Sequence, residues 1–416
     1  MKEIKIIGLM LIAVLLTACR SYDEEPPGEK ELPVINVYVY SPDRPIVTRS
    51  DVGPVDPIDN TTNESEIKKL QIWVFNHDAT DGMAAGELVA YYSPESVTNL
   101  NGNTNGVTYQ LSVSEAFAQQ PDPKPAVDVY VLANVTAENC GLTLDEKTTR
   151  AALEAAIMQK KDETHDYFGL TNPIKLVPAD GLPMSGVQRG AIVSGSSPVY
   201  SLPTVTLTRT VSKVRFIFSR EKPTGDDEDI DKPISIKNIK LGASIQNGDV
   251  VVERVIPTQE YLFLAPANEN DPPLPYHIND VYNNAAAEFL PDVLSDIEKS
   301  ENPLKYVYQS QTAQDYENLI AEGISKIVDG NEVKELTQVG PFYLRESNKK
   351  LKGLITYQRA GADAKTLPFE METAGDFSRN HTWTVYVYYS VSGLVAVKVT
   401  VKDWTDSPKD HEVYNW

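Results

Sequence analysis

Histidine and cysteine, whose spacing would reveal a metal site most directly, are sparse in this chain. It has five histidines and two cysteines among 416 residues. The histidines are His77, His165, His277, His381 and His411. No two of them lie four residues apart and none has a cysteine nearby, so the sequence contains no zinc-binding motif. We therefore expect each histidine to be an ordinary surface or strand-edge residue.

Motifs for nucleophilic catalysis and phosphate binding are absent from the sequence as well. It contains no Gly-x-Ser-x-Gly elbow, no P-loop and no dinucleotide-binding fingerprint. Two acidic clusters, residues 78–81 and 226–231, lack the alternating ligands and central glycine of a calcium loop, so we interpret both as solvated loops. We predict no catalytic, cofactor-binding or metal-binding residue, no cofactor, and a protein that is not an enzyme.

Cys19 is the residue with the clearest chemical role, because it ends a signal-peptide pattern. Lys2 and Lys5 precede an apolar run over residues 6–16, which is too short to span a bilayer. The run closes on Leu-Thr-Ala-Cys, which resembles the lipobox cut by the lipoprotein signal peptidase. We predict a signal peptide over residues 1–18 and lipidation of Cys19, whose acyl chains, palmitate among them, would anchor the protein at a membrane. The alternative is a chance cysteine after an ordinary secretory signal.

The residues after Cys19 indicate where the protein is anchored. Position 20 is Arg and not the Asp that commonly marks inner-membrane retention, and residues 21–25 resemble the acidic surface-export signal of some Gram-negative lipoproteins. These features predict a surface-exposed protein on the cell outer membrane. Residues 19–32 are acidic, contain proline and have few large apolar side chains, so we expect a disordered tether.

Composition limits the class of protein and the number of domains. The net charge of −21 leaves no basic surface for nucleic acid, which we exclude as a partner. If Cys19 is acylated, Cys140 has no cysteine to pair with and should be a small buried hydrophobe. About 385 residues follow the tether, and a single hydrophobic core seldom organises so long a chain. We predict an N-terminal domain over residues 33–200 and a C-terminal domain over residues 201–416, divided near the Gly/Ser/Pro stretch 196–203.

The pattern of large residues predicts β-strands through most of the chain. Tyrosine is abundant, with 21 residues, and short runs of alternating apolar and polar residues recur between Pro, Gly, Asn and Asp clusters. The expected strands cover residues 34–40, 67–76, 87–92, 107–113, 127–135, 204–219, 234–243, 250–256, 351–357, 381–390 and 394–404. Residues 391–393 supply a turn that makes the last two a hairpin.

Helical signals are limited to two segments. Thr143 and Glu146 match a capping box, and good helix formers follow, so we expect about four helical turns over residues 143–158. A weaker helical spacing of apolar residues covers residues 313–327. The sequence therefore predicts an all-β fold with short helical insertions.

Several segments together resemble the fimbrillins, the lipoprotein-derived subunits of the type V pili of Gram-negative anaerobes. These segments are residues 67–76 with 86–88, 129–134, 182–186, 205–216 with Arg209 and Lys213 inside, Arg379-Asn380-His381, and Lys402-Asp403-Trp404. The resemblance implies two tandem transthyretin-like, Greek-key β-sandwich domains. It also implies a structural subunit of a cell-surface fimbrium that contributes to adhesion and has other fimbrial subunits as partners, in a homo- or hetero-polymer.

The first expected strand, residues 34–40, is apolar on both faces and so belongs inside a sheet. Its candidate plug residues are Val34, Ile35, Val37, Tyr38, Val39 and Tyr40. In fimbrillins an Arg-specific protease releases the lipidated first strand, and another subunit's strand fills the groove. The resemblance makes the Arg49–Ser50 bond our candidate for cleavage, because Arg44 precedes a proline that most proteases refuse. The alternative is that Arg49 is a charged loop residue that is never cut.

The resemblance places the donor strand at the C-terminus, where Val413, Tyr414 and Trp416 are the candidates. Asp406, Glu412 and their polar neighbours suit a buried strand poorly, so a stalk, tip or anchor subunit all remain open. A second hypothesis is a monomeric surface lipoprotein that binds a glycan or peptide of a host or bacterial surface through exposed aromatic side chains. An enzyme is a third, for which the sequence offers no residue.

Overall fold

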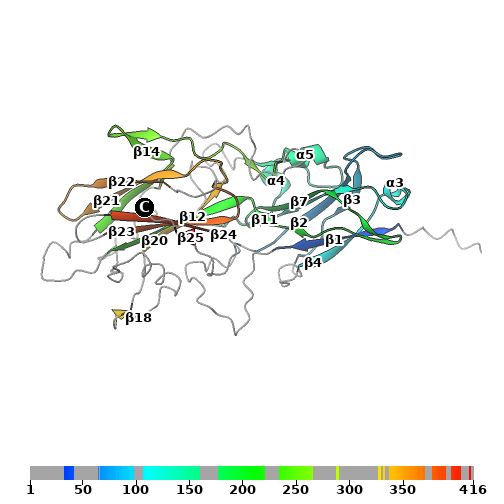
Figure 1. Ribbon diagram of the computed structural model, residues 1–416, viewed down its shortest axis with the longest axis horizontal. Coiled ribbons are helices and arrows are strands. Elements are labelled where there is room, and N and C mark those ends of the chain that lie inside the picture. Colours follow the sequence, from blue (N-terminus) through cyan, green and yellow to red (C-terminus); the bar gives the residue numbers. More distant parts are fainter. Residues whose placement is uncertain are drawn as a thin grey trace, which may run out of the picture.

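The fold is built almost entirely of β-strands. The computed structural model describes residues 32–41, 64, 66–97, 106–159, 177–220, 234–265, 287–289, 327–328, 331–332, 337–370, 377–389, 395–403 and 412–413. Within these residues the helices are short: α3 (Glu115–Ala118), α4 (Ala137–Cys140) and α5 (Arg150–Glu154). The strands form two sandwiches that follow one another along the long axis of the molecule (Figure 1). The predicted all-β class is confirmed.

The first sandwich, which we call the N-terminal sandwich, packs two sheets face to face. One sheet has the order β10-β1-β9-β8, with β4 also paired to β1, and contains β1 (Val34–Tyr40), β4 (Val107–Ser112), β8 (Ser194–Ser196), β9 (Val199–Ser201) and β10 (Val205–Thr206). The other has the order β11-β7-β5-β2-β3, from β2 (Leu70–Asn76), β3 (Leu88–Tyr92), β5 (Val127–Ala133), β7 (Met184–Ala191) and β11 (Thr208–Arg209). A single core of buried, mostly aliphatic residues lies between them.

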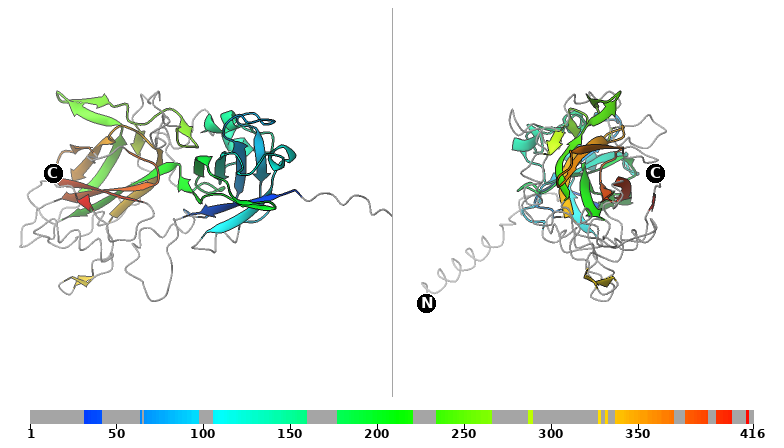
Figure 2. Two further views of the ribbon diagram at one scale, coloured as in Figure 1. Left: turned by 45° about the vertical axis from the view of Figure 1, so that its right-hand side comes forward. Right: turned by 90° about the vertical axis from the view of Figure 1, so that its left-hand side faces the viewer.

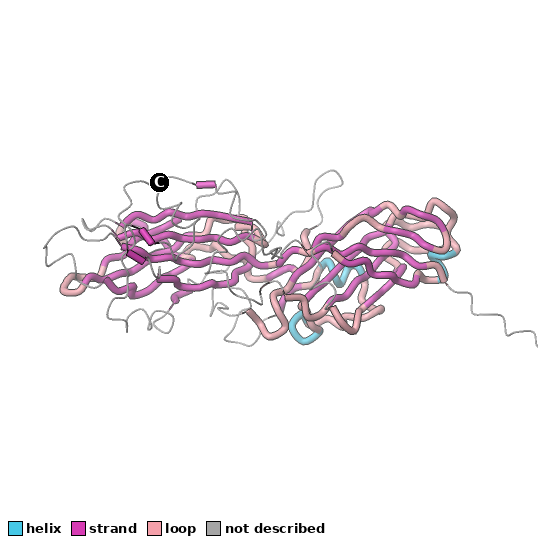
Figure 3. Tube along the Cα trace, turned by 90° about the horizontal axis from the view of Figure 1, so that it is seen from below, coloured by secondary structure: helices cyan, strands magenta, loops and turns pink. Residues whose placement is uncertain are grey.

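Alternation along the strands decides which side chains reach this core. In β1 every second residue is buried and the rest are half-buried, as a sheet with one covered face requires. In β5 all seven residues are buried. Val129 and Val131 point into the core between the sheets, whereas Tyr130 and Leu132 point to the outer face, where Leu153 of α5 packs on them. The short helices, all in this half of the molecule (Figure 3), include α4 and α5, which cover that face of β5.

The second sandwich, the C-terminal sandwich, has the same two-layer construction. One sheet has the order β20-β12-β23-β24-β25, from β12 (Val211–Arg220), β20 (Thr337–Arg345), β23 (His381–Tyr389), β24 (Val395–Asp403) and β25 (Glu412–Val413). The other has the order β17-β13-β21-β22, from β13 (Ile234–Leu241), β17 (Ala287–Phe289), β21 (Lys352–Arg359) and β22 (Lys365–Glu370). Phe216, Trp383 and Ile355 lie in the core between the sheets. The expected pairing of residues 381–390 with 394–404 is confirmed by the antiparallel β23–β24 ladder.

Three two-stranded ribbons complete the described chain. They are β14 (Ala243–Gln246) with β15 (Asp249–Val252), β6 (Ile157–Met158) with β16 (Glu260–Tyr261), and β18 (Ile327–Val328) with β19 (Asn331–Glu332). The β6–β16 ribbon joins a segment of the N-terminal sandwich to the segment that follows β15. A third buried cluster, containing Trp73, Tyr130, Phe263 and Tyr343, fills the junction where the two sandwiches meet (Figure 2).

The expected strand over residues 204–219 is three strands in three sheets. The chain passes from β10, beside β1, to β11, beside β7, and then to β12 in the C-terminal sandwich. Because β9, β10 and β11 all pair within the N-terminal sandwich, we propose that the domains divide at Thr210 and not at residue 200. The Greek-key connectivity stays a prediction.

The expected helix over residues 143–158 is wrong in length. The helix begins at Arg150, where the Thr149 side chain caps it by accepting a bond from the Ala152 N–H, and it ends at Glu154. Thr143 does not cap it; its carbonyl instead accepts a bond from the Thr148 hydroxyl in the preceding turn. Pairing of Ile157 and Met158 with β16 ends the helical run early. The weaker helix over residues 313–327 lies outside the described residues except for its last position, which is in β18.

Candidate functional site

Strand β1 is enclosed by neighbours on both edges. Its antiparallel partner β4 runs along it from Val34 opposite Ser112 to Val39 opposite Val107. On the other edge it is parallel to β9 at its beginning and to β10 at its end. The expectation that residues 34–40 lie inside a sheet is therefore confirmed. Figure 2 shows β1 in blue along the lower face of the N-terminal sandwich, next to β4.

The inner face of β1 is apolar and fully covered. Ile35, Val37 and Val39 each have no exposed surface, and they pack against the valines and leucines of the opposite sheet. The outer face, which includes Asn36, Tyr38 and Tyr40, is half-buried. Three of the six candidate residues of this strand therefore hold β1 in the core.

Backbone hydrogen bonds fix both ends of β1. The Val34 N–H donates to the Pro198 carbonyl at 2.9 Å, and the Tyr40 carbonyl accepts from the Leu207 N–H at 2.8 Å. Gly106, with φ +82°, lets the chain before β4 approach closely, because a Cβ there would lie 2.6 Å from the Val39 carbonyl oxygen. The slot around β1 is thus shaped for an extended backbone along its whole length.

Tyr109 on β4 lies directly opposite Val37 and forms part of the slot wall. It is 8% exposed, its ring centroid is 5.9 Å from that of Tyr92, and its hydroxyl has no hydrogen-bond partner among the described residues. Burial raises the pKa of this phenol to about 12.

The other residues proposed for assembly are placed only in part. Cys19, Arg49, Ser50, Tyr414 and Trp416 lie outside the described residues. Val413 lies in β25, which pairs antiparallel with β24 at the edge of the C-terminal sheet, opposite Thr400. These assignments stay predictions.

A buried carboxylate, Glu64, ties the chain before β2 to the C-terminal sandwich. One of its oxygens lies 2.9 Å from the Lys213 Nζ, and the other accepts a 2.6 Å bond from the Tyr343 hydroxyl. Its carbonyl also accepts a bond from the Arg209 Nε at 3.1 Å. Lys213 and Tyr343 are paired on β12 and β20, and the three ionisable side chains of the two contacts are almost completely buried.

More buried charges continue the junction beside Glu64. Arg379 donates to the carbonyls of Tyr261 and Leu262 and to the Glu346 carboxylate, and Arg345 donates to the Pro257 carbonyl. Glu260 accepts a 2.5 Å bond from the Thr210 hydroxyl. Its pKa is raised to about 8, chiefly by burial, although that hydrogen bond and the two arginines oppose the shift. Arg209, Lys213 and Arg379 belong to the fimbrillin-like segments of the sequence, whereas the glutamates that contact them do not.

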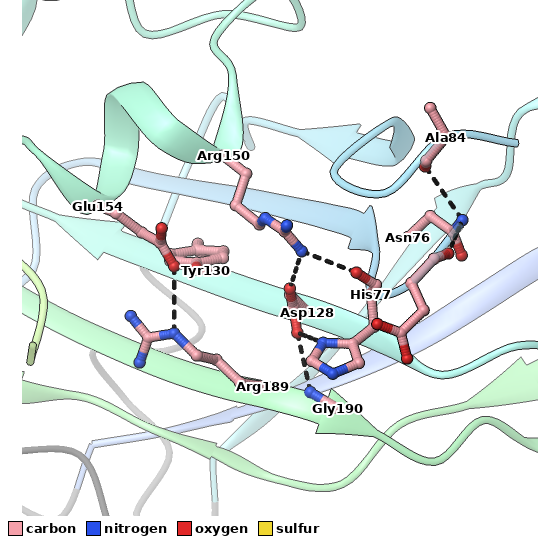
Figure 4. A network of polar contacts seen from close by, with 10 residues as sticks. Asn76, His77, Ala84, Asp128, Tyr130, Arg150, Glu154, Arg189 and Gly190 are labelled. Atoms are coloured by element: carbon pink, nitrogen blue, oxygen red, sulfur yellow. Dashed lines mark hydrogen bonds and ion pairs between the residues drawn. The ribbon is translucent and has the colours of Figure 1, made fainter. Parts of the chain in front are cut away.

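A second polar network fastens α5 to the outer face of the N-terminal sandwich (Figure 4). The buried Asp128 carboxylate accepts bonds from the Arg150 guanidinium at 2.6 Å and the Gly190 N–H at 2.8 Å, and it contacts the His77 Nδ1 at 2.6 Å. Tyr130 donates to Glu154 at 2.6 Å, and burial is the main cause that raises the pKa of this phenol.

The contact between Asp128 and His77 resembles the acid–histidine pair of a catalytic site, but here it holds elements of the fold together. Among the described residues, the contacts of the Asp128 carboxylate are with His77, Arg150 and Gly190, and no hydroxyl or thiol is one of them. His77, which directly follows β2 and is partly exposed, thus has a structural partner. The His381 Nδ1 contacts the Arg379 carbonyl oxygen at 2.7 Å, and the other three histidines lie outside the described residues.

Neither a metal cluster nor a membrane-spanning helix is found within the described part of the chain. No group of three or more His, Cys, Asp or Glu side chains there could hold a metal ion. Among the same residues, no helix is long and apolar enough to cross a bilayer. Cys140 is buried, as expected, and burial raises the pKa of its thiol.

The fold defines an all-β sandwich protein whose first described strand is enclosed on both edges. Residues 46–237 match the family model of the major fimbrial subunit protein, FimA. This match confirms the resemblance to the fimbrillins that the sequence indicates. The matched family is one of structural fimbrial subunits and not of enzymes. No curated protein matches the chain significantly.

Solved structures that match the chain carry related descriptions. They include a fimbrilin (FimA) from Porphyromonas gingivalis W83, with 12% identity, covering 90% of this chain and 98% of that chain, at a TM-score of 0.44. A putative cell adhesion protein from Parabacteroides distasonis ATCC 8503 has 13% identity, with 89% and 97% covered, at a TM-score of 0.44. The fimbrial anchor protein Mfa2 from Porphyromonas gingivalis has 9% identity, with 89% and 98% covered, at a TM-score of 0.35.

Proposed function

We propose that this chain is a structural subunit of a fimbrium that assembles by strand exchange. Removal of β1 opens a slot in the N-terminal sandwich, and an extended strand of another subunit fills it. The observation that carries the proposal is the position of β1, the first described strand, between β4 on one edge and β9 and β10 on the other. Such a position allows full backbone pairing of a replacement strand.

The burial of β1 supplies the driving force for assembly. Each of its three fully buried side chains contributes roughly 1.5–3 kcal/mol, or about 5–9 kcal/mol together before entropy is counted. Whole domains are stable by only about 5–15 kcal/mol. A subunit that has lost β1 is therefore unstable alone and gains this free energy again when a neighbour's strand enters the slot.

Processing and anchoring of the precursor complete the proposal. Lipidated Cys19 holds it at the outer membrane, and an Arg-specific protease cuts after Arg49 and so separates β1 from the rest of the chain. The candidate bond lies between Ser41 and Glu64, both of them buried in the structure. Cleavage thus leaves β1 held by non-covalent contacts alone, while Glu64 retains the new N-terminal part at the junction.

Electrophoresis of surface material without boiling tests this function. We expect a ladder of multimers whose subunits begin at Ser50 by N-terminal or mass analysis. An Arg49→Ala variant should abolish the ladder, whereas the matched Arg44→Ala variant should keep it, because Arg44 precedes a proline. A uniform monomer that begins at acylated Cys19 would contradict strand exchange. It would favour a fimbrial anchor or a monomeric glycan- or peptide-binding lipoprotein.

A further inference from the structure

The buried side chains of β1 define which side chains a replacement strand must carry. Its inner face presents Ile35, Val37 and Val39, all without exposed surface, to a close-packed core. Such a core accepts side chains of similar volume and shape and resists larger or polar ones. A replacement strand must therefore carry three aliphatic side chains of Val or Ile size at alternate positions.

The backbone neighbours of β1 add a direction and a register to this requirement. A replacement strand must run antiparallel to β4 and parallel to β9 and β10. The parallel edge is interrupted, because β9 pairs with β1 as far as Asn36 and β10 begins opposite Val39. At the interruption the Leu202 N–H donates to the Asn36 carbonyl at 3.0 Å. These contacts favour one register of the incoming strand.

The C-terminal tail of this chain does not meet the requirement. Residues 405–416 read Thr-Asp-Ser-Pro-Lys-Asp-His-Glu-Val-Tyr-Asn-Trp, with Val413 as their one Val, Ile or Leu. In one register His411, Val413 and Asn415 face the core, and in the other Glu412, Tyr414 and Trp416 do so. Every run of three alternate positions in the tail contains a polar or charged residue. The core that lines the slot consists of hydrophobic residues, which would leave such a polar or charged side chain without a hydrogen-bond partner.

Several described strands have the required alternation, such as Leu70, Ile72 and Val74 in β2, and they are engaged elsewhere. Val395, Val397 and Val399 alternate in β24, but this strand is paired along its length with β23 inside the C-terminal sandwich. It is therefore not free to enter another subunit's slot.

We propose, on the basis of the strand-exchange function above, that the slot of this subunit receives a strand from a different protein and not the tail of a second copy. The partner is a subunit with an extended segment that carries three aliphatic residues at alternate positions. This chain consequently assembles as one component of a hetero-polymer and does not form a homopolymer through its own tail.

Peptide competition on the full mature chain tests the proposal. A recognition site for a specific protease is inserted after Arg49, the chain is cut, and a fluorophore on the N-terminal fragment reports release of β1. The first peptide copies residues 33–41 and the second copies residues 405–416. We expect the first to displace the fragment and the second to require about 100-fold more peptide or more, because it carries two polar side chains into the core.

Two altered tail peptides distinguish the effect of alternating aliphatic residues from the effect of hydrophobicity alone. His411→Val with Asn415→Val creates three alternate valines around Val413 and should restore displacement to within about tenfold of the strand copy. Asp406→Val with Ser407→Val adds the same two valines without creating the alternation and should not restore it.

The possible outcomes are distinct. If the native tail displaces the fragment as well as the copy of residues 33–41 does, the slot does not discriminate and the hetero-polymer inference is overturned. The same holds if both altered tails restore displacement equally. If the copy of β1 itself never exchanges into the cut protein, the strand-exchange function fails, and the inference fails with it.

Discussion

Truncation of the inner face of β1 should weaken the protein in proportion to the volume removed. Ile35 has no exposed surface, so Ile35→Ala should lower the free energy of unfolding by about 2–5 kcal/mol. Val37→Ala and Val39→Ala each remove about two methylene equivalents, or about 1.6 kcal/mol, plus a cavity term. The triple variant should lose about 5–10 kcal/mol, which is comparable with the whole stability of a domain.

Urea denaturation of the intact, uncut chain measures this loss. The matched controls are Asn36→Ala and Tyr38→Phe on the half-buried outer face of the same strand, which we expect to change the free energy of unfolding by less than about 1 kcal/mol. The linear slope of the denaturation curve should stay unchanged if the exposed surface does not differ between variants. If Ile35→Ala costs no more than Asn36→Ala, the inner face of β1 does not hold the strand and the reasoning is refuted.

Three further substitutions test the junction and the slot wall. Glu64→Gln removes the carboxylate from buried Lys213 and should destabilise the protein by about 3–5 kcal/mol in urea denaturation, whereas Glu66→Gln, in an exposed ion pair, should cost less than about 1 kcal/mol. Because the folded pKa of Glu260 is raised from 4.5 to about 8, the folded state binds the extra proton and stability should fall as pH rises through that window. Glu260→Gln should flatten this fall, and an unchanged pH profile would contradict it. Tyr109→Phe deletes a buried hydroxyl that has no hydrogen-bond partner among the described residues, so it should stabilise the protein by about 1 kcal/mol and raise the thermal midpoint slightly. A lowered midpoint would contradict this prediction.

Regular alternation is the feature that made part of the fold predictable. The expected strand over residues 34–40 has the bounds of β1, and its two apolar faces indicated a place inside a sheet. The hairpin of β23 and β24 followed from two alternating runs and the turn between them. In both cases local sequence and tertiary pairing agree, so the pattern was sufficient.

Tertiary pairing overrode local pattern elsewhere. The run over residues 204–219 contains no Pro or Gly to interrupt it, yet the chain changes sheets twice within it. Alternation sets which face a side chain takes but carries no information on the neighbouring strand. Likewise, good helix formers continue to Met158, but Ile157 and Met158 gain strand partners at Glu260 and Tyr261, about a hundred residues away.

The junction shows the same limit for charged residues. Arg209 and Lys213 were named from the sequence as part of the segment, residues 205–216, that resembles the fimbrillins. Their partner Glu64 lies 149 residues before Lys213 and belongs to no strand, so nothing local marks it as buried. A charged residue inside a predicted strand signals that a partner of opposite charge is required. It does not indicate which of the many acidic residues supplies it.

Amide hydrogen exchange before and after removal of residues 20–49 tests most directly whether β1 fills a slot. Our account predicts that the amides of Val107–Ser112 in β4 lose protection when β1 leaves, while those of β12 and β23 keep theirs, and that the chain then associates with other molecules. Unchanged protection of β4 in a stable protein that stays monomeric would contradict the account.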